Sequence, residues 1–131
     1  AQGDILRDHE GKPLRRPGLL RGCKAIGWYI EEYGCAQVSM NINDMELCPI
    51  HIAYETVCAV ARDLGAEVTG TELIGLIPEE CMLRAGHYFA TKQGIDTQEP
   101  TKLIALAIDA MHMDDLGPFD TDQKVLRIAE L

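Results

Sequence analysis

The chain has 131 residues, of which 47% are hydrophobic and 25% are charged, and its formal net charge is −9. This length predicts one domain, and the composition is typical of a soluble globular protein. The negative charge argues against a general nucleic-acid binder, because such proteins neutralise phosphates with Lys and Arg. No apolar run approaches the roughly 20 residues that a membrane helix needs, so we expect no membrane partner.

Residues 1–21 predict a basic linker or loop, because glycines and prolines interrupt the segment throughout. Half of the 12 Lys and Arg residues of the chain lie before residue 25: Arg7, Lys12, Arg15, Arg16, Arg21 and Lys24. A solvated basic tail explains this cluster. The alternative is an arm that contacts an anionic ligand or an acidic partner.

Residues 22–42 predict a β-hairpin. Residues 22–33 fit a helical stripe and strand alternation equally well, but Gly27 and the aromatic and β-branched content favour a strand. Gly34 then offers a tight turn. Residues 35–42 alternate with a period of two, which predicts a half-buried strand with apolar Val38, Met40 and Ile42 on one face and polar Gln37, Ser39 and Asn41 on the other. The pattern leaves open whether this polar face is solvated or meets a ligand.

A helix is predicted between Pro49 and Gly65, which suit a helix start and a C-terminal cap. His51 and Glu55 are four residues apart on it, and we interpret them as a surface pair rather than a catalytic pair.

Residues 66–77 predict a buried strand, because a short apolar run surrounds Gly75 and ends at Pro78. This strand is either plain core or a strand whose Thr71 and Glu72 face a ligand. A helix should follow Pro78 and end near Gly94, and another should run from about residue 99 to 113 before the Gly117–Pro118 break. The tail, which carries Val125, Leu126 and Ile128, is expected to dock onto the body.

The five cysteines include no CxxC pair and no tight spacing, which predicts reduced, mostly buried thiols in a reducing cytoplasm. His51, His87 and His112 fall on separate predicted helices, and His9 falls in a loop. Zinc ligands are usually spaced more closely than this, so we expect no metal site.

Four segments carry a resemblance to a known family: residues 25–34 (AIGWYIEEYG), 36–41 (AQVSMN), 68–78 (VTGTELIGLIP) and 116–119 (LGPF). They resemble glutamate formiminotransferase, whose domain is also the transferase half of formiminotransferase-cyclodeaminase. The likeness covers most of residues 12–131 in the right order. Thr71 departs from it, since Ser is expected there, but Thr keeps the hydroxyl.

The resemblance implies an α+β fold with two ferredoxin-like αβ sandwiches, of which residues 22–131 match only the second, with extra C-terminal helices. It implies transfer of a formimino group from N-formimino-glutamate to tetrahydrofolate, in histidine degradation and one-carbon metabolism. A histidine of the first sandwich serves as general base in the family, so no catalytic residue is assigned to this chain. Tetrahydrofolate is a co-substrate, and the implied partners are formimino-glutamate, the N-terminal subdomain and further copies in a cytoplasmic homo-oligomer.

The expected sheet is incomplete, because a ferredoxin-like sheet has strand order 4-1-3-2 and this chain offers no central strand 1 and no first helix. Each unpaired backbone group would cost on the order of 1–3 kcal/mol if buried. We therefore expect a C-terminal half that is inactive alone, or a sheet repaired by a partner or by direct pairing of its flanking strands.

The expected substrate-binding residues are Gln37, Ser39, Asn41, Thr71 and Glu72, on the wall of a tunnel between the two sandwiches. Amide and hydroxyl groups there suit carboxylates and a pterin edge. Glu72 either pairs with the cationic formimino group or forms a structural ion pair. Two rival functions remain: a non-enzymatic ferredoxin-like module that binds a small molecule or serves assembly, and a purely structural interaction domain.

Overall fold

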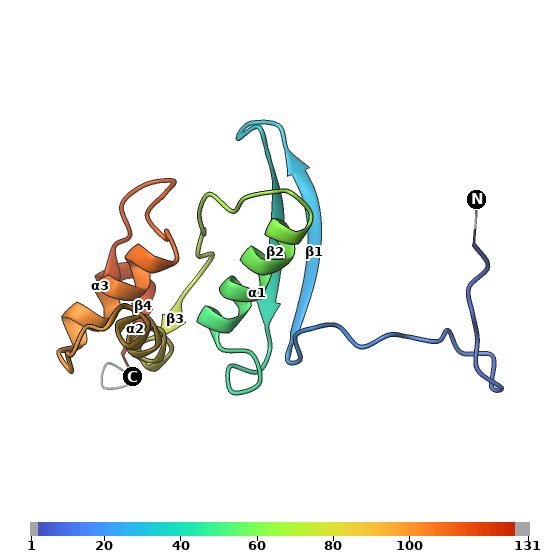
Figure 1. The fold of residues 1–131 in the computed structure, drawn as a ribbon, viewed down its shortest axis with the longest axis horizontal. Helices are drawn as coiled ribbons and strands as arrows, with labels where there is room; N and C mark the ends of the chain where they lie inside the picture. The colour runs from blue at the N-terminus through green and yellow to red at the C-terminus, as the bar shows by residue number, and fades with distance from the viewer. Residues whose placement is uncertain (1–2, 128–131) are drawn as a thin grey trace.

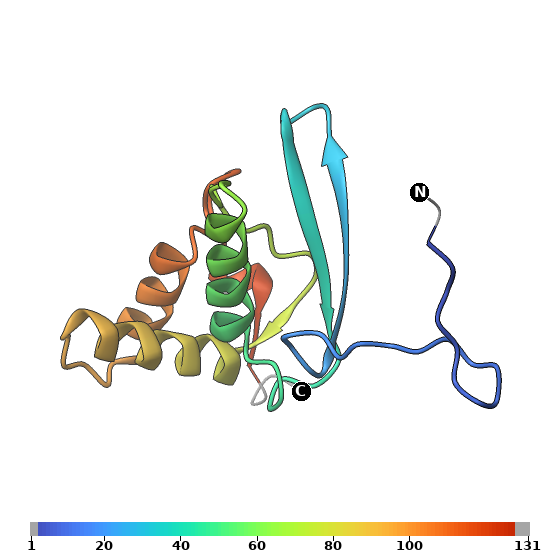
Figure 2. The ribbon, with the colours of Figure 1, turned by 45° about the vertical axis from the view of Figure 1, so that its right-hand side comes forward.

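The computed structural model describes residues 3–127, which form a mixed α+β fold with a β-hairpin on one side and a helical body on the other (Figure 1). The elements in chain order are β1 (Cys23–Ile30), β2 (Cys35–Ile42), α1 (Ile50–Asp63), β3 (Ile77–Pro78), α2 (Glu79–Gln93), α3 (Pro100–Ala110), α4 (Thr121–Lys124) and β4 (Val125–Leu126). Residues 3–21 run away from this body as an extended arm (Figures 1 and 2).

The predicted hairpin is confirmed. β1 and β2 pair antiparallel with Ile30 opposite Cys35, and Gly34 makes the turn with a φ of 63°. The prediction of a half-buried face is wrong at Val38, which is 52% exposed. Neither strand contains a buried residue, because little of the described chain packs over the hairpin. Its backbone pairing, rather than a hydrophobic interior, therefore defines the hairpin.

The core lies between α2 and α3. Met82, Ala85 and Phe89 of α2 are buried together with Ile104 and Ala107 of α3. Both helices present apolar side chains at helical spacing, so their packing removes most of the apolar surface that the body buries.

Gly86 sets how closely these two helices approach. A Cβ atom at this position would lie 2.6 Å from the carbonyl carbon and 2.8 Å from the Cα of Leu103. Both distances are shorter than carbon contacts allow, so the α3 backbone occupies the space that any other residue at position 86 would need.

The predicted ends of α1 and α2 are also confirmed, whereas α3 ends at Ala110, short of the predicted residue 113. α1 starts directly after Pro49 and α2 directly after Pro78. Gly94 ends α2 in the left-handed conformation with a φ of 71°, which glycine adopts without strain. Gly65 follows α1, and its N–H donates to the Arg62 carbonyl.

The predicted strand over residues 66–77 is wrong, because only Ile77–Pro78 is a strand. Residues 66–76 contain no regular element, and Ile74 is 80% exposed. Backbone groups of this segment form hydrogen bonds outside any sheet. The Thr71 N–H donates to the His112 carbonyl (3.0 Å), and Lys124 Nζ donates to the Leu73 carbonyl (2.9 Å). A strand needs a neighbour to accept its hydrogen bonds, and residues 3–127 provide one only at β4.

The C-terminal tail docks as predicted. β4 pairs parallel with β3, matching Ile77 with Val125, and Val125 is buried in the core. The α4 turn just before it is capped by Asp120, whose side chain accepts from the Asp122 N–H. Ile128 lies outside the described residues.

Candidate functional site

Gln37, Ser39 and Asn41 share one face of β2, because side chains alternate along a strand. Gln37 and Ser39 are half-buried, and Asn41 is exposed. Directly opposite residues in an antiparallel pair share a face, so this row lies beside the β1 residues with which it pairs: Trp28 opposite Gln37, Ile26 opposite Ser39 and Lys24 opposite Asn41.

This face of the hairpin combines three kinds of group. Amide and hydroxyl groups from β2 can donate and accept hydrogen bonds. Trp28, which is 46% exposed, offers an aromatic surface, and Lys24 offers a positive charge. Such a surface suits a flat ring with polar edges and an attached anionic group.

Thr71 and Glu72 lie on the segment 66–76, away from any strand. Thr71 is half-buried and Glu72 is exposed. Within residues 3–127, no hydrogen bond joins either residue to β2. Figures 1 and 2 draw the segment on the side of β2 that carries the helical body, with β1 on the far side. The segment and the β2 row therefore belong to separate parts of the fold.

The segment is held by the loop that follows α3. A Cβ atom on Gly70 would lie 2.7 Å from Asp115 Cγ, so the Asp115 side chain packs directly against the Gly70 backbone. His112, which accepts the hydrogen bond of Thr71, has a φ of 49°. The Thr71 backbone is therefore held by this loop and not by the hairpin.

The interpretation of His51 and Glu55 as a surface pair is wrong for His51, which is 8% exposed. Its ring packs on Tyr88 of α2 at a centroid distance of 4.8 Å. Glu55 instead pairs with Lys92, with 2.6 Å between Oε2 and Nζ. Tyr88 is distant in sequence, so the local spacing of α1 gave no sign of this contact.

The surroundings of His51 favour the neutral form of its ring. Burial lowers its pKa, the charge of Arg84 lowers it further, and Glu55 opposes the change. Its Nδ1 is buried and has no hydrogen-bond partner among the described residues. The ring thus acts as a packing group between α1 and α2.

We expect the stability of the protein to fall as the pH drops below about 6.5, the value of an unperturbed histidine. The unfolded chain takes up a proton on His51 there, whereas the folded protein resists it until the pH reaches the lowered pKa. Urea unfolding at about pH 7.5 and pH 5.5 measures this loss.

His51→Phe should flatten this pH dependence, because it keeps an aromatic ring against Tyr88 without a titrating nitrogen. His87→Gln is the matched control, since His87 is exposed on α2. An equal effect of the two substitutions would contradict the assignment to His51.

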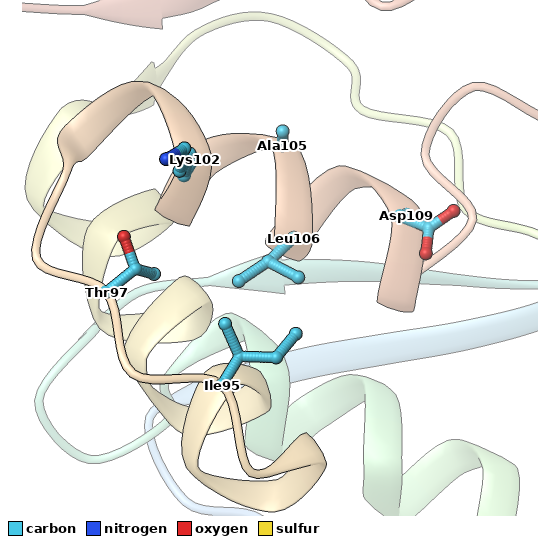
Figure 3. Close-up of a pocket in the computed structure, with 6 residues that line it drawn as sticks. All are labelled: Ile95, Thr97, Lys102, Ala105, Leu106 and Asp109. Carbon is cyan, nitrogen blue, oxygen red and sulfur yellow. The ribbon is translucent and has the colours of Figure 1, made fainter.

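Two shallow cavities lie on the helical body. One, of about 430 Å³, is lined by His87, Tyr88, Thr91 and Lys92. The other, of about 320 Å³, lies between α3 and the loop before it, where Figure 3 shows Ile95 and Leu106 facing one another and Lys102, Thr97 and Asp109 around them. Neither cavity contains a predicted site residue, so neither supports the predicted tunnel wall.

Within residues 3–127, no group of three or more His, Cys, Asp or Glu side chains could hold a metal ion. The same part of the chain contains no helix long and apolar enough to cross a membrane.

The family model of the formiminotransferase domain matches residues 4–129. The chain is 36% identical to formimidoyltransferase-cyclodeaminase from Gallus gallus over 117 residues, which is 89% of this chain and 22% of that protein. It is 33% identical to the Rattus norvegicus protein of the same name, with the same coverage. It is 38% identical to glutamate formimidoyltransferase from Streptococcus pyogenes over 79 residues, which is 60% of this chain and 26% of that protein.

The chain thus spans about a quarter or less of the length of these curated relatives. The resemblance seen in the sequence is confirmed, and the matched range includes both the hairpin and the helical body. The chain belongs to the formiminotransferase domain family.

Proposed function

We propose that this chain is the substrate-binding C-terminal half of a glutamate formimidoyltransferase, which moves a formimino group between N-formimino-glutamate and tetrahydrofolate. The match of the family model to residues 4–129 carries this proposal. The transferase name of the Streptococcus pyogenes relative supports it. The catalytic base lies in the N-terminal subdomain, so this chain is inactive alone. The working enzyme is a cytoplasmic homo-oligomer.

The fold that this function needs is a ferredoxin-like sandwich. The ferredoxin-like sheet has the spatial strand order 4-1-3-2. In this proposal β1 of the chain takes the place of the second strand of that fold, β2 takes the place of the third, and residues 66–78 follow the path of the fourth. The central strand then lies between β2 and the segment 66–76, supplied from outside residues 3–127. Two observations support this arrangement: within residues 3–127 β2 pairs only with β1, and Figures 1 and 2 draw the segment 66–76 on the other side of β2 from β1.

The polar face of β2 binds and orients the substrates in this proposal. Gln37 and Asn41 donate amide N–H groups to substrate carboxylates, and Ser39 bonds the polar edge of the pterin ring. Trp28, across from Gln37, packs against the ring. Thr71 and Glu72 line the opposite wall of the tunnel. Holding two reactants in register is itself a large part of catalysis, and this is the contribution of the C-terminal half.

Alanine substitution of the β2 amides tests the proposal in a full-length protein that carries this domain. Gln37→Ala and Asn41→Ala should each lower kcat/KM by about 10- to 150-fold, the equivalent of one lost hydrogen bond to a charged group. Steady-state kinetics with each substrate varied in turn measures the effect. Gln93→Ala is the matched control, because Gln93 is an exposed amide at the end of α2. Unchanged kinetics for both β2 variants would remove these residues from the site.

One observation favours a second candidate, a non-enzymatic module that serves assembly. Ile26, Trp28, Tyr29 and Val38 expose apolar surface on the hairpin, as an interaction surface does. Calorimetry of this chain with tetrahydrofolate and with glutamate separates the two. Heat on either titration supports the substrate-binding half, and its absence with both favours assembly.

A further inference from the structure

The base of the hairpin is fixed against the turn that precedes α1. The Gly22 carbonyl accepts hydrogen bonds from the N–H groups of Asn43 (2.7 Å) and Asp44 (3.0 Å). A Cβ atom on Gly22 would lie 3.0 Å from the Cβ atoms of both Asp44 and Leu47. Cys23 is the next residue after Gly22, so β1 begins directly beside residues 43–47.

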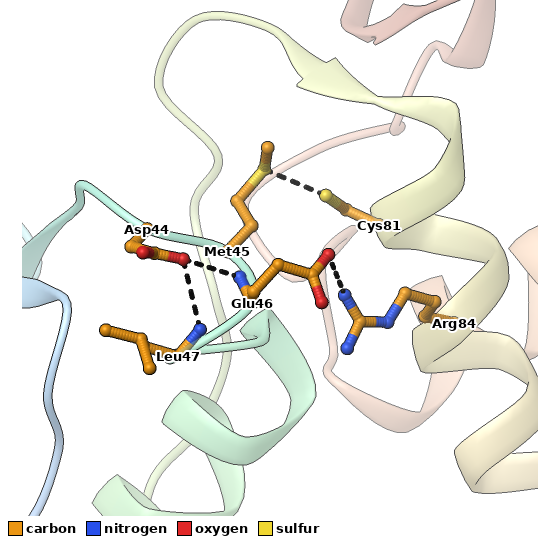
Figure 4. Close-up of polar contacts among 6 residues, drawn as sticks. All are labelled: Asp44, Met45, Glu46, Leu47, Cys81 and Arg84. Carbon is orange, nitrogen blue, oxygen red and sulfur yellow. Dashed lines mark hydrogen bonds and ion pairs between the residues drawn. The ribbon is translucent and has the colours of Figure 1, made fainter.

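The same turn is held from its other side by α2 (Figure 4). Asp44 Oδ1 accepts from the Glu46 and Leu47 N–H groups at 2.9 and 3.1 Å. Glu46 Oε1 lies 2.9 Å from Arg84 Nη1, and Met45 Sδ lies 2.9 Å from Cys81 Sγ. The turn ends at Cys48, whose N–H donates to the Asp44 carbonyl (2.9 Å). Cys48 is therefore held in place by the turn rather than free to move away.

These constraints bring Cys23 and Cys48 close together beside the Gly22 contact, so that their thiols are neighbours. Cys48 is 0% exposed and Cys23 is half-buried. Burial, together with the hydrogen bond and charge of the neighbouring Cys23 thiol, raises the pKa of Cys48 to about 11. Only Cys23 of this pair is open to solvent, so an external reagent meets Cys23 first.

The remaining cysteines have other neighbours. Cys35 lies at the far end of the hairpin, opposite Ile30. Cys58 hydrogen-bonds Tyr54 one turn away on α1 and thereby helps to raise the pKa of Tyr54 to about 12. Cys81 is buried against Met45. Among the described residues, Cys23 and Cys48 are the thiols that the backbone geometry joins.

We propose that Cys23 and Cys48 form a dithiol modification site that low-molecular-weight disulfides, such as oxidised glutathione, convert to an intramolecular disulfide. The Cys23 thiolate attacks one sulfur of oxidised glutathione, which forms a mixed disulfide and releases one glutathione thiolate. That thiolate takes the proton of Cys48. Cys48 then attacks Cys23 Sγ and releases the second glutathione. The protein loses two protons and two electrons, and one oxidised glutathione becomes two reduced molecules.

The cross-link ties the first residue of β1 to the residue before Pro49, and so closes a loop that contains the whole hairpin. Such closure restricts the unfolded chain more than the folded one, so the oxidised protein should unfold at a temperature several degrees higher.

Oxidised glutathione and non-reducing peptide mapping test the proposal. The protein without substitutions should give one cross-linked pair of peptides that contains Cys23 and Cys48. Dithiothreitol should reverse both the cross-link and the rise in unfolding temperature. Cys48→Ser should stop at a stable glutathione adduct on Cys23. Cys23→Ser should leave Cys48 unmodified, because it is buried, and this variant serves even if Cys48→Ser does not fold.

Cys58→Ser is the control and should form the same cross-link as the unmodified protein. Three results would each overturn the proposal. These are a cross-link through another cysteine, a lasting glutathione adduct on Cys23 in the protein without substitutions, and the absence of any reaction at Cys23.

Discussion

Gly86→Ala is expected to destabilise the protein by about 3 kcal/mol, although Gly to Ala inside a helix is ordinarily stabilising by about 1 kcal/mol. The sign reverses because the added methyl group overlaps the backbone of Leu103, including its carbonyl oxygen. A side chain could rotate away from such an overlap, but a helix backbone cannot. α2 and α3 must therefore separate, which loosens the packing of the core around Met82 and Phe89.

Urea unfolding followed by circular dichroism measures this loss. Gly27→Ala is the control, because the nearest atom to a Cβ at Gly27 is the Gln37 carbonyl oxygen at 3.7 Å, an ordinary contact. We expect that control to change stability by no more than about 1 kcal/mol. A Gly86→Ala protein as stable as the unmodified one would show that α2 and α3 do not approach as closely as described.

Leu103→Ala should cost about 2–5 kcal/mol, the range for a leucine removed from a packed interior. Leu103 is 2% exposed on α3, and its backbone contacts α2 at Gly86. The loss combines the transfer of its side-chain carbons with the cavity that remains. Since small domains have about 5–15 kcal/mol of stability in total, this single change removes a large part of it.

Leu64→Ala provides a matched comparison, because it makes the same chemical change at a residue that is 80% exposed at the end of α1. It should shift the free energy of unfolding by about 0.5 kcal/mol or less. Equal effects of the two substitutions would place the core elsewhere than between α2 and α3.

Local sequence patterns predicted the hairpin and the three long helices. Alternation in residues 35–42, the turn at Gly34 and the helix ends at Pro78 and Gly94 are all properties of neighbours in the chain, and each is confirmed. The segment 66–77 was mispredicted because its apolar composition resembles a strand, whereas strand formation depends on a partner outside the segment.

The candidate site was predictable to a similar extent. Alternation placed Gln37, Ser39 and Asn41 on one face of β2, since that property is local. Where Thr71 lies could not be predicted, because it depends on a hydrogen bond to His112 far along the chain. The burial of His51 against Tyr88 and the close approach at Gly86 were missed for the same reason.

The pairing of β3 with β4 has a consequence for the order of biosynthesis. Ile77 and Val125 are both part of the core, yet nearly fifty residues separate them in sequence. A nascent chain that has exposed α2 and α3 still lacks Val125, so its interior stays open while the ribosome continues. Folding of this domain must then wait until residues 125–126 have left the exit tunnel, and translational pausing shortly before that point would prolong exposure of the apolar helix faces to chaperones.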